Sequence, residues 1–404
     1  MGPVRRRGLL AALVVLLVGA GPAHGASAPL PTRLANALAV PGNAPSASGA
    51  IAVDLLTGAT VFTRNADTPL APASNEKLAV TFTALHELGA GYRFRTEVFG
   101  RGYEDGTTWY GDVYLKGFGD PTLTSLQLDR LATQIAELGI TRITGRVYAD
   151  ESWFDALRMG PGWKAAFFIN ECPPLSALVV DRAIYDHHTA RQPAVAAAGV
   201  LRRLLRAHGV TAGAVGPGRA PETALALAQV ESDPLADILR TMDRESDNFI
   251  AEMLAKAIGA EVGDRGSTAA GAAIMLRDLA AAGIPLTGVR IADGSGLSLD
   301  DRLTARALAS LLVLAWGDDD LRLSLWSALP VAGVNGTLED RMERAPARGA
   351  VRAKTGTTDR ASALSGYVRD RYVFAVLQNG YPVASWSARK AQDRFATALA
   401  SAAD

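Results

Sequence analysis

The sequence is poor in the residues on which disulfides and metal sites depend. Cys172 is the only cysteine among 404 residues, so no intramolecular disulfide can form. A buried, small apolar side chain is a better interpretation of Cys172 than a thiol nucleophile. None of the five histidines has HExxH spacing, and the pair His187-His188 is better explained by a polar loop than by metal ligation. We therefore predict no metal and no cofactor.

An excess of either charge is also absent. The chain has 41 basic and 41 acidic residues, and this balance gives no reason to expect a nucleic acid partner. Hydrophobic residues make up 49% of the chain, which is ample for a large core and for more than one domain. Lysine is scarce, with only six in the sequence, so each lysine within a motif carries more information.

Long apolar runs are missing after the N-terminus. There, Arg5 to Arg7 precede an apolar run from Leu9 to Ala20, followed by small residues up to Ala28. This pattern predicts a secretory signal peptide over 1–28, and hence a periplasmic or cell-wall location. A membrane anchor is the alternative, but twelve apolar residues fall short of the about 20 that span a bilayer. No cysteine follows the run, which disfavours a lipoprotein anchor.

Strand and helix patterns divide the chain into three parts. Between 92 and 229, short strand patterns at 112–116 and 143–148 flank a helix pattern at 126–138, and proline and tryptophan interrupt the rest. We expect an inserted mixed α/β domain here, between two parts of a catalytic domain at 29–91 and 230–404. Strand patterns at both ends of the chain, with helices between them, predict an α+β fold whose sheet joins distant segments. The expected strands of that sheet are 49–56, 59–63, 352–356, 363–369 and 372–378, and the expected helices are 74–88, 235–258, 267–282, 304–315 and 385–402.

Ser74 and Lys77 are candidates for a nucleophile and its base. Residues three apart lie on one face of a helix, so the lysine amine can reach the serine hydroxyl. A desolvated lysine, or one near a second cation such as Lys354, has a lowered pKa and can accept a proton. Ser74 also stands where a helix begins, and free N–H groups there favour an oxyanion. Glu76 is expected to turn away from the site, as a structural residue. Taken alone, the pair is better explained by an ordinary helix start with a solvated lysine.

The triplet Ser246-Asp247-Asn248 is weak by itself, because a solvated helix start also explains it. In an acyl-transfer site, Ser246 would relay a proton between Lys77 and the leaving amine. Asn248 would bind the acyl-side amide of the substrate and hold Lys77. Asp247 should point elsewhere and serve the structure.

The segment Lys354-Thr355-Gly356-Thr357 is the most specific of the three. It predicts an edge strand beside the site, in which Gly356 lets a substrate backbone approach closely. The hydroxyls of Thr355 and Thr357, together with Lys354, can bind a terminal carboxylate. The N–H groups of Thr357 and Ser74 would form the oxyanion hole. A basic β-turn is the alternative interpretation of the segment in isolation.

Together and in this order, the three motifs resemble the S-x-x-K, S-D-N and K-T-G elements of penicillin-binding proteins and serine β-lactamases. The chain is more specifically similar to the D-alanyl-D-alanine carboxypeptidase/endopeptidase family, the penicillin-binding-protein-4-like serine peptidases of class C. Matching stretches cover most of the chain, with one difference after Ser298, where Leu299 stands in place of the arginine that the family often has. The stretches are 72–77, 119–123, 175–178, 293–298, 333–338 and 354–357.

The resemblance implies a transpeptidase-like fold, an antiparallel sheet flanked by helices, with an insert between the first two motifs. It implies a serine D-Ala-D-Ala carboxypeptidase that acts on peptidoglycan peptides through a Ser74 acyl-enzyme and that penicillin acylates. Cleavage of peptide cross-links, an endopeptidase activity, uses the same acylating groups and stays open, as does the oligomeric state. The alternatives are a β-lactamase or esterase on the same fold and a non-catalytic envelope protein that binds peptidoglycan. Peptidoglycan peptides and β-lactams are the expected partners.

Overall fold

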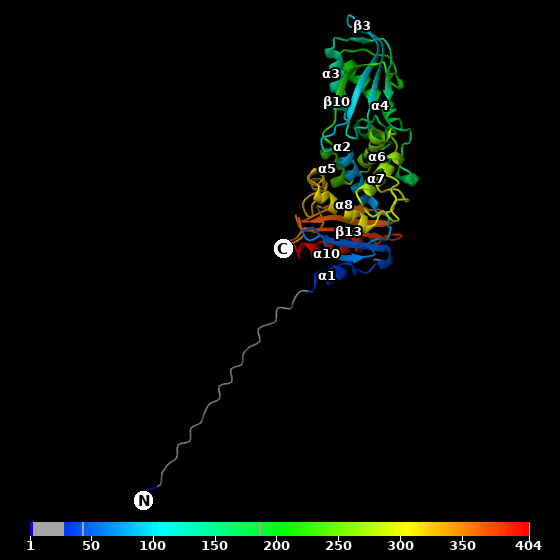
Figure 1. The fold of residues 1–404 in the computed structure, drawn as a ribbon. Coiled ribbons are helices and arrows are strands. Elements are labelled where there is room, and N and C mark those ends of the chain that lie inside the picture. The colour runs from blue at the N-terminus through cyan, green and yellow to red at the C-terminus, as the bar shows by residue number, and fades with distance from the viewer. Residues whose placement is uncertain (3–27, 43, 186, 404) are drawn as a thin grey trace.

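The computed structural model describes residues 1–2, 28–42, 44–185 and 187–403 of the chain. The molecule is elongated, with helices α1 (Leu30–Leu38) and α10 (Ser385–Ala400) at one end and the strand hairpin that includes β3 at the other (Figure 1). The predicted signal peptide covers residues 1–28, and residues 3–27 of it lie outside the described part of the chain. Within the described ranges, every helix is too short or too polar to cross a membrane.

A five-stranded sheet joins the two ends of the chain. Its strand order is β11-β12-β13-β1-β2, and each neighbouring pair is antiparallel. The C-terminal strands follow one another as hairpins, and β13 pairs with β1 from the N-terminal part. The predicted α+β class and the union of distant segments are therefore confirmed. The strands are β1 (Ser48–Asp54), β2 (Thr60–Arg64), β11 (Val351–Thr357), β12 (Ala361–Val368) and β13 (Tyr372–Asn379).

Both faces of this sheet are covered by helices. Successive side chains of a strand point to opposite faces, so each strand contributes to two clusters. On β13, Phe374 and Val376 face α1 and α10, where they join a cluster with Leu34 and Phe395. The intervening residues, such as Leu377, face a layer of helices on the other side. The cover on both faces explains why β12 and β13 are buried along nearly their whole length.

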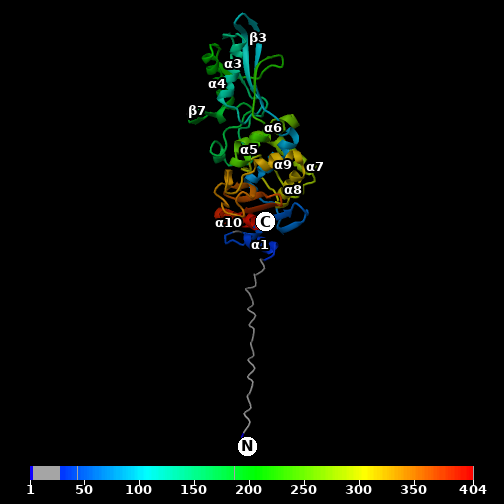
Figure 2. The same cartoon turned by 90° about the vertical axis from the view of Figure 1, so that its left-hand side faces the viewer.

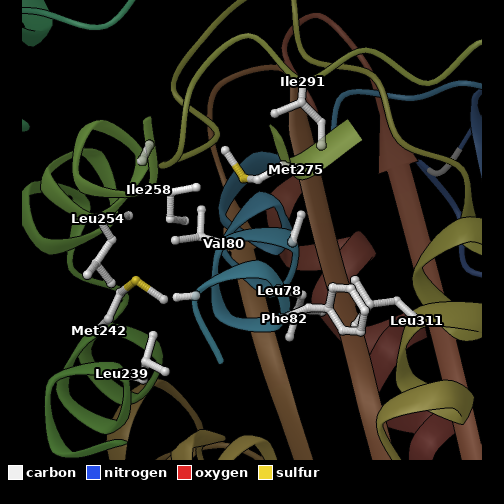
Figure 3. Close-up of a cluster of buried hydrophobic side chains, with 14 of the residues drawn as sticks. Leu78, Val80, Phe82, Leu239, Met242, Leu254, Ile258, Met275, Ile291 and Leu311 are labelled. Carbon is white, nitrogen blue, oxygen red and sulfur yellow. The ribbon is translucent and has the colours of Figure 1, made fainter. Parts of the chain in front are cut away.

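Helix α2 (Lys77–Leu88) lies at the centre of the helical layer (Figure 3). Leu78, Val80 and Phe82 point in different directions from it, toward side chains of α5, α6, α7 and α8. Residues 77–85 are all buried. A helix that is apolar around its whole circumference belongs in a core. Lys77, the candidate base at its first position, therefore lies inside the protein. The neighbouring helices are α5 (Leu235–Glu245), α6 (Asn248–Gly263), α7 (Thr268–Ala281), α8 (Ala305–Gly317) and α9 (Asp319–Ala328).

A second, mixed sheet stands at the far end of the molecule (Figures 1 and 2). Its strand order is β10-β3-β4-β6-β9, with β5 paired to β4. Helices α3 (Ser125–Glu137) and α4 (Pro193–Ala207) share a separate apolar cluster with it. The strands are β3 (Arg95–Asp105), β4 (Thr108–Gly117), β5 (Arg142–Ile143), β6 (Val147–Asp150), β9 (Val215–Pro217) and β10 (Leu225–Glu231), and a small hairpin is formed by β7 (Ile184–Tyr185) and β8 (His188–Thr189).

Two predicted elements are divided in the structure. The helical region expected over 235–258 is interrupted at Ser246, which has the left-handed φ of 58°, and Asp247 starts a new helix by accepting a hydrogen bond from the Ile250 N–H. The strand expected over 143–148 is two short strands, because Gly145 turns the chain against β4. Helices α4 and α9 and strands β3 and β10 were not predicted. The turns of 3₁₀ helix are Pro45–Ala47, Ala73–Glu76, Ala165–Phe167, Asp181–Ala183 and Gly336–Leu338.

Candidate active site

Ser74 lies in the 3₁₀ turn that leads directly into α2, and Lys77 is the first residue of that helix. The Lys77 Nζ donates to the Ser74 Oγ at 3.1 Å. It also donates to the Asn248 Oδ1 and to the carbonyl oxygen of Ser295, both at 2.8 Å. The amine is thus held by three oxygens from three distant parts of the chain, and it points at the hydroxyl.

Burial controls the protonation of this lysine. The Lys77 side chain has no solvent exposure, and desolvation lowers its pKa to about 8. The carboxylates of Asp293, Glu252 and Asp243 act in the opposite direction and keep the pKa from falling further. A neutral amine is therefore accessible near neutral pH, as proton transfer from Ser74 requires.

Ser246 stands between two helices, and its hydroxyl faces the second lysine. The Lys354 Nζ donates to the Ser246 Oγ at 2.8 Å and to the Thr355 carbonyl at 3.0 Å. Asp247 turns away, as expected, and pairs with Arg182 while it caps α6. Within the described part of the chain, Ser246 makes no direct hydrogen bond to Lys77, so the relay expected between them is not preformed.

Lys354 lies on strand β11 and is also fully buried. Burial lowers the pKa of Lys354, the nearby charge of Lys77 lowers it further, and Asp243 counteracts both. Asp243 is buried as well and accepts a hydrogen bond from the Thr81 hydroxyl at 2.7 Å. It is the anion that influences both amines, and no motif in the sequence marks it.

The rest of the third motif borders the cleft. The Thr355 hydroxyl donates to the Thr337 hydroxyl at 2.7 Å, and Arg389 of α10 donates to the Thr357 Oγ1 at 3.3 Å. A Cβ on Gly356 would lie 3.0 Å from the Ser74 amide nitrogen and 2.9 Å from the Pro72 carbonyl oxygen. Glycine therefore lets β11 approach the backbone of the nucleophile itself.

A buried loop supplies the Ser295 carbonyl that holds Lys77. Glu252 of α6 accepts from the N–H groups of Gly294 and Ser295, at 3.0 and 2.8 Å. Asp293 accepts from the N–H groups of Gly296 and Ser298, both at 2.7 Å. These two carboxylates orient the loop from beneath. Residues 293–298 appear in the sequence only as a stretch of family resemblance, without an assigned contact.

Glu76 turns away from Ser74, as expected, into this same buried region. Its side chain has no exposure, and neither of its carboxyl oxygens has a hydrogen-bond partner among the described residues. Burial raises the pKa of Glu76 well above its ordinary range, and the charges of Asp293 and Glu252 raise it further. Asp301 shows the same direction, because burial and Asp293 raise its pKa. Burial beside the Asp293 and Glu252 carboxyl groups thus disfavours the charged form of Glu76.

Segments from the sequence-predicted insert reach the site. The Asn248 side-chain amide donates to the carbonyl of Glu171 at 3.2 Å, and the Trp163 indole donates to Asp293 at 2.7 Å. Phe154, Leu175 and other residues up to Ala183 belong to the apolar cluster around α2 and α6. The stretch 151–191 comes directly after strand β6 of the second sheet. It therefore connects that sheet to helices α2 and α6, against which it packs.

A cleft of about 490 Å³ opens beside Ser74. It is of a size that holds small ligands. In the part of the chain that the structure describes, no group of three or more His, Cys, Asp or Glu side chains could hold a metal ion. The residues that line the cleft are Ser74, Ser246, Gly336, Thr337, Asp340, Arg341, Thr355, Gly356, Thr357 and Arg389.

The eight predicted site residues are thus brought to one place by three remote segments. Ser74 comes from the 3₁₀ turn before α2, and Lys77 from the first position of α2. Ser246 and Asn248 come from the α5–α6 junction, and 354–357 from the edge strand β11. An antiparallel sheet between helical layers, with a cleft-lining serine and a buried lysine beside its edge strand, defines the class of penicillin-binding proteins and serine β-lactamases.

Within that class the chain belongs to the D-Ala-D-Ala carboxypeptidase 3 (S13) family, whose model matches residues 30–194 and 186–401. It is 31% identical to the D-alanyl-D-alanine carboxypeptidase of Actinomadura sp. (strain R39), over 83% of this chain and 78% of that protein. It is 32% identical to the carboxypeptidase DacB of Mycolicibacterium smegmatis, over 93% and 86% of the two chains. The resemblance drawn from the sequence is confirmed.

The fold is likewise that of a solved relative. The crystal structure of penicillin binding protein 4 from Haemophilus influenzae superposes with a TM-score of 0.80, covering 92% of this chain and 98% of the other at 24% identity. The same protein has been solved in complex with a β-lactam, with a TM-score of 0.76. The predicted transpeptidase-like fold is confirmed.

Proposed function

We propose that this protein is a serine D-Ala-D-Ala carboxypeptidase that cleaves peptidoglycan stem peptides through an acyl-enzyme on Ser74 and that β-lactams acylate at the same hydroxyl. The observation that carries the proposal is the hydrogen bond from a fully buried Lys77 amine to the Ser74 Oγ. Family membership and the naming of both relatives as carboxypeptidases support the same substrate class.

The first step forms one bond and moves one proton. The Ser74 oxygen attacks the carbonyl carbon of the penultimate D-Ala, and the Lys77 amine takes the hydroxyl proton. The negative charge that develops on the carbonyl oxygen is met by the N–H groups of Ser74 and Thr357. Asn248 binds the acyl-side amide, while Lys354, Thr355 and Thr357 bind the terminal carboxylate, and Gly356 keeps the strand close to the nucleophile.

The second step breaks the C–N bond and needs a proton on the leaving amine. Ser246 provides it and is reprotonated by Lys354, from which it accepts a hydrogen bond. The charge of Lys77 lowers the pKa of Lys354, so protonation of the first lysine favours proton loss from the second. The lysine pair thus carries the same total charge before the attack and after the amine has left, with the proton transferred from Lys354 to the leaving group and the Ser74 proton held on Lys77. Water then hydrolyses the ester and regenerates Ser74.

We also propose the division of the chain and its location. The insert at 92–229 is built around the second sheet with α3 and α4, and its stretch 151–191 returns to the catalytic part at 29–91 and 230–404. The N-terminal pattern over 1–28 supports secretion to the periplasmic or cell-wall space.

The Ser74→Ala substitution tests the nucleophile. It is expected to abolish covalent labelling by a fluorescent penicillin and release of D-Ala from a stem pentapeptide, because Ser74 carries the hydroxyl to which Lys77 donates among the described residues. Labelling is read on a denaturing gel and D-Ala release by mass spectrometry. Full labelling of the variant would eliminate the proposal. Wild-type turnover of penicillin at many cycles per second would instead identify a β-lactamase, and binding of peptidoglycan without D-Ala release a non-catalytic protein.

A further inference from the structure

A basic groove runs over α10 at the end of the molecule where α1 also lies (Figure 1). It is a cavity of about 690 Å³, and we call it the α10 groove. Its cationic side chains come from α1, α10 and the loop before β11, and Trp386 is the large aromatic residue beside them. The cations are Arg33, Arg341, Arg389, Lys390 and Arg394.

Most of this positive charge is uncompensated. Asp393 is the one acid that lines the groove, and it pairs with Arg341 at 2.6 Å. Arg389, Lys390 and Arg394 are exposed, and none of them forms an ion pair with a carboxylate of the residues that the structure describes. A concave surface lined by one sign of charge concentrates ligands of the opposite sign.

The α10 groove adjoins the catalytic cleft. Arg341 and Arg389 line both cavities. Arg389 also donates to the hydroxyl of Thr357, within the motif that borders Ser74. A ligand that leaves the cleft past Thr357 therefore meets the cations of α10 next.

The proposed function decides which part of the substrate lies on this side. Thr355 and Thr357 hold the carboxylate of the residue that departs, so the α10 groove extends the leaving-group side. A single D-Ala ends at these threonines and is too small to reach α10. In a peptide cross-link, the leaving amine belongs to a second stem peptide, which continues beyond the scissile bond and carries further carboxylates.

We propose that the α10 groove binds the anionic second stem peptide of a cross-linked substrate, which makes it a specificity site for endopeptidase cleavage. This inference rests on the proposed acyl-transfer function and names the substrate class that the site favours. Guanidinium groups suit the task, because they bind carboxylates with two parallel hydrogen bonds. Trp386, 72% exposed and covered by the Lys390 amine at 4.6 Å from its ring centroid, offers a flat surface for the peptide.

An anionic lipid surface is the rival occupant, because exposed tryptophan beside cations also suits a membrane interface. Two observations favour the peptide. The cations line a concavity, and that concavity shares Arg341 and Arg389 with the cleft that holds Ser74.

The test uses two double variants, one in the α10 groove and one in α4, and measures each on two substrates. Lys390→Gln with Arg394→Gln removes two exposed charges from the α10 groove and leaves Arg389 in place. Arg203→Gln with Arg206→Gln removes two exposed charges from α4, in the second sheet's layer, and is the matched control. For each protein, kcat/KM is measured on a stem pentapeptide and on a cross-linked muropeptide dimer, at low and high salt, together with the rate of penicillin acylation.

The groove variant is expected to lose about tenfold in kcat/KM on the dimer, as removal of two charge-assisted contacts predicts. Its loss on the pentapeptide should stay below about twofold, and the salt dependence of dimer cleavage should weaken. The same contrast is expected in a binding measurement. In a Ser74→Ala background, the affinity for the dimer by calorimetry falls about tenfold in the groove variant and is unchanged in the α4 variant.

Three results would overturn the inference. They are equal effects on both substrates, no effect on the dimer, and loss of binding to phosphatidylglycerol vesicles with dimer cleavage intact, which would assign the α10 groove to lipid. Absence of penicillin acylation and of D-Ala release in the wild type is a different outcome. It would refute the proposed chemistry, while the calorimetric comparison would still decide the α10 groove.

Discussion

At the scale of single residues, the central feature of the site is a pair of buried amines that carry like charge when both are protonated. Lys77 and Lys354 are both without solvent exposure. Burial lowers the pKa of each, and Lys77 lowers that of Lys354 further. Asp243 is the shared anion that raises both. The chemistry thus depends on a residue outside the three motifs, because the balance of charge, and not only the presence of amines, sets which lysine is neutral.

This balance predicts the pH dependence of acylation. Lys77 must be neutral to accept a proton, and its pKa is lowered only to about 8. Below that value the amine is protonated, so the penicillin acylation rate should fall by about tenfold per pH unit on the acidic side. Asp243→Asn keeps an acceptor for Thr81 but removes the charge that raises the pKa of Lys77. The midpoint should move to lower pH, by about half to one unit.

The measurement is stopped-flow acylation between pH 6 and 9. Asp237→Asn is the matched control, because that residue lies on the same helix with its carboxylate paired to Arg240 at the surface. It should leave the midpoint in place. A midpoint that does not move in Asp243→Asn, or that moves upward, would contradict the role assigned to the carboxylate.

At the scale of elements, the junction between α5 and α6 creates a catalytic position. A continuous helix would leave Ser246 as one residue among many on its surface. Instead Ser246 takes a left-handed conformation that ends α5, and Asp247 caps α6 through the Ile250 N–H at 2.9 Å. The break aims the Ser246 hydroxyl at Lys354 and the Asn248 amide at Lys77.

Removal of the cap should therefore affect stability and catalysis together. Asp247→Ala is expected to lower the free energy of unfolding by about 1–2 kcal/mol, since it loses an N-cap and the pair with Arg182. The midpoint of thermal unfolding should fall by a few degrees, and acylation should slow. Asp247→Ser retains a capping oxygen and should recover about half of the lost stability. If the alanine variant melts with the wild type, the junction is held by something other than this cap.

At the scale of the whole molecule, the catalytic part and the insert are not independent. Apolar residues from 154 to 183 share the core of α2 and α6. Trp163 of this stretch donates to Asp293, which orders the loop whose Ser295 carbonyl holds Lys77. A chain of contacts thus links the stretch 151–191 with Lys77, the proposed base.

Trp163→Phe tests that link. The substitution keeps the aromatic ring but removes a buried hydrogen bond worth about 1 kcal/mol, so acylation is expected to slow by about fivefold. Trp153→Phe is the control, because the Trp153 indole N–H is buried without a partner in the part of the chain described by the structure. That change should leave the rate almost unaltered. Equal rates in the two variants would show that Asp293 is held without the indole.

The sequence was sufficient for the family and the fold class. The eight residues that it predicts lie together at one site, and their catalytic roles stay a prediction. Apolar alternation predicts the strands of the five-stranded sheet, and Gly89, with φ of 82°, ends α2 where expected. Patterns failed where tertiary packing overrides them. Strand β3 ends in an exposed, largely polar stretch, and β10 is short and exposed at four of its seven positions. Helix α4 begins in an alanine-rich segment whose apolar face is needed only against the second sheet.

The sequence by itself determined local features: the strands of the five-stranded sheet, most helices of the catalytic part and the motifs that nominate site residues. The reason is that periodicity and short motifs are properties of neighbouring residues. Only the tertiary structure decided which charges surround the two amines, that Lys354 donates a hydrogen bond to Ser246, and that Arg389 of α10 donates one to Thr357. The physical reason is that pKa values and pockets depend on burial and on distances between remote segments. No spacing along the chain encodes either quantity.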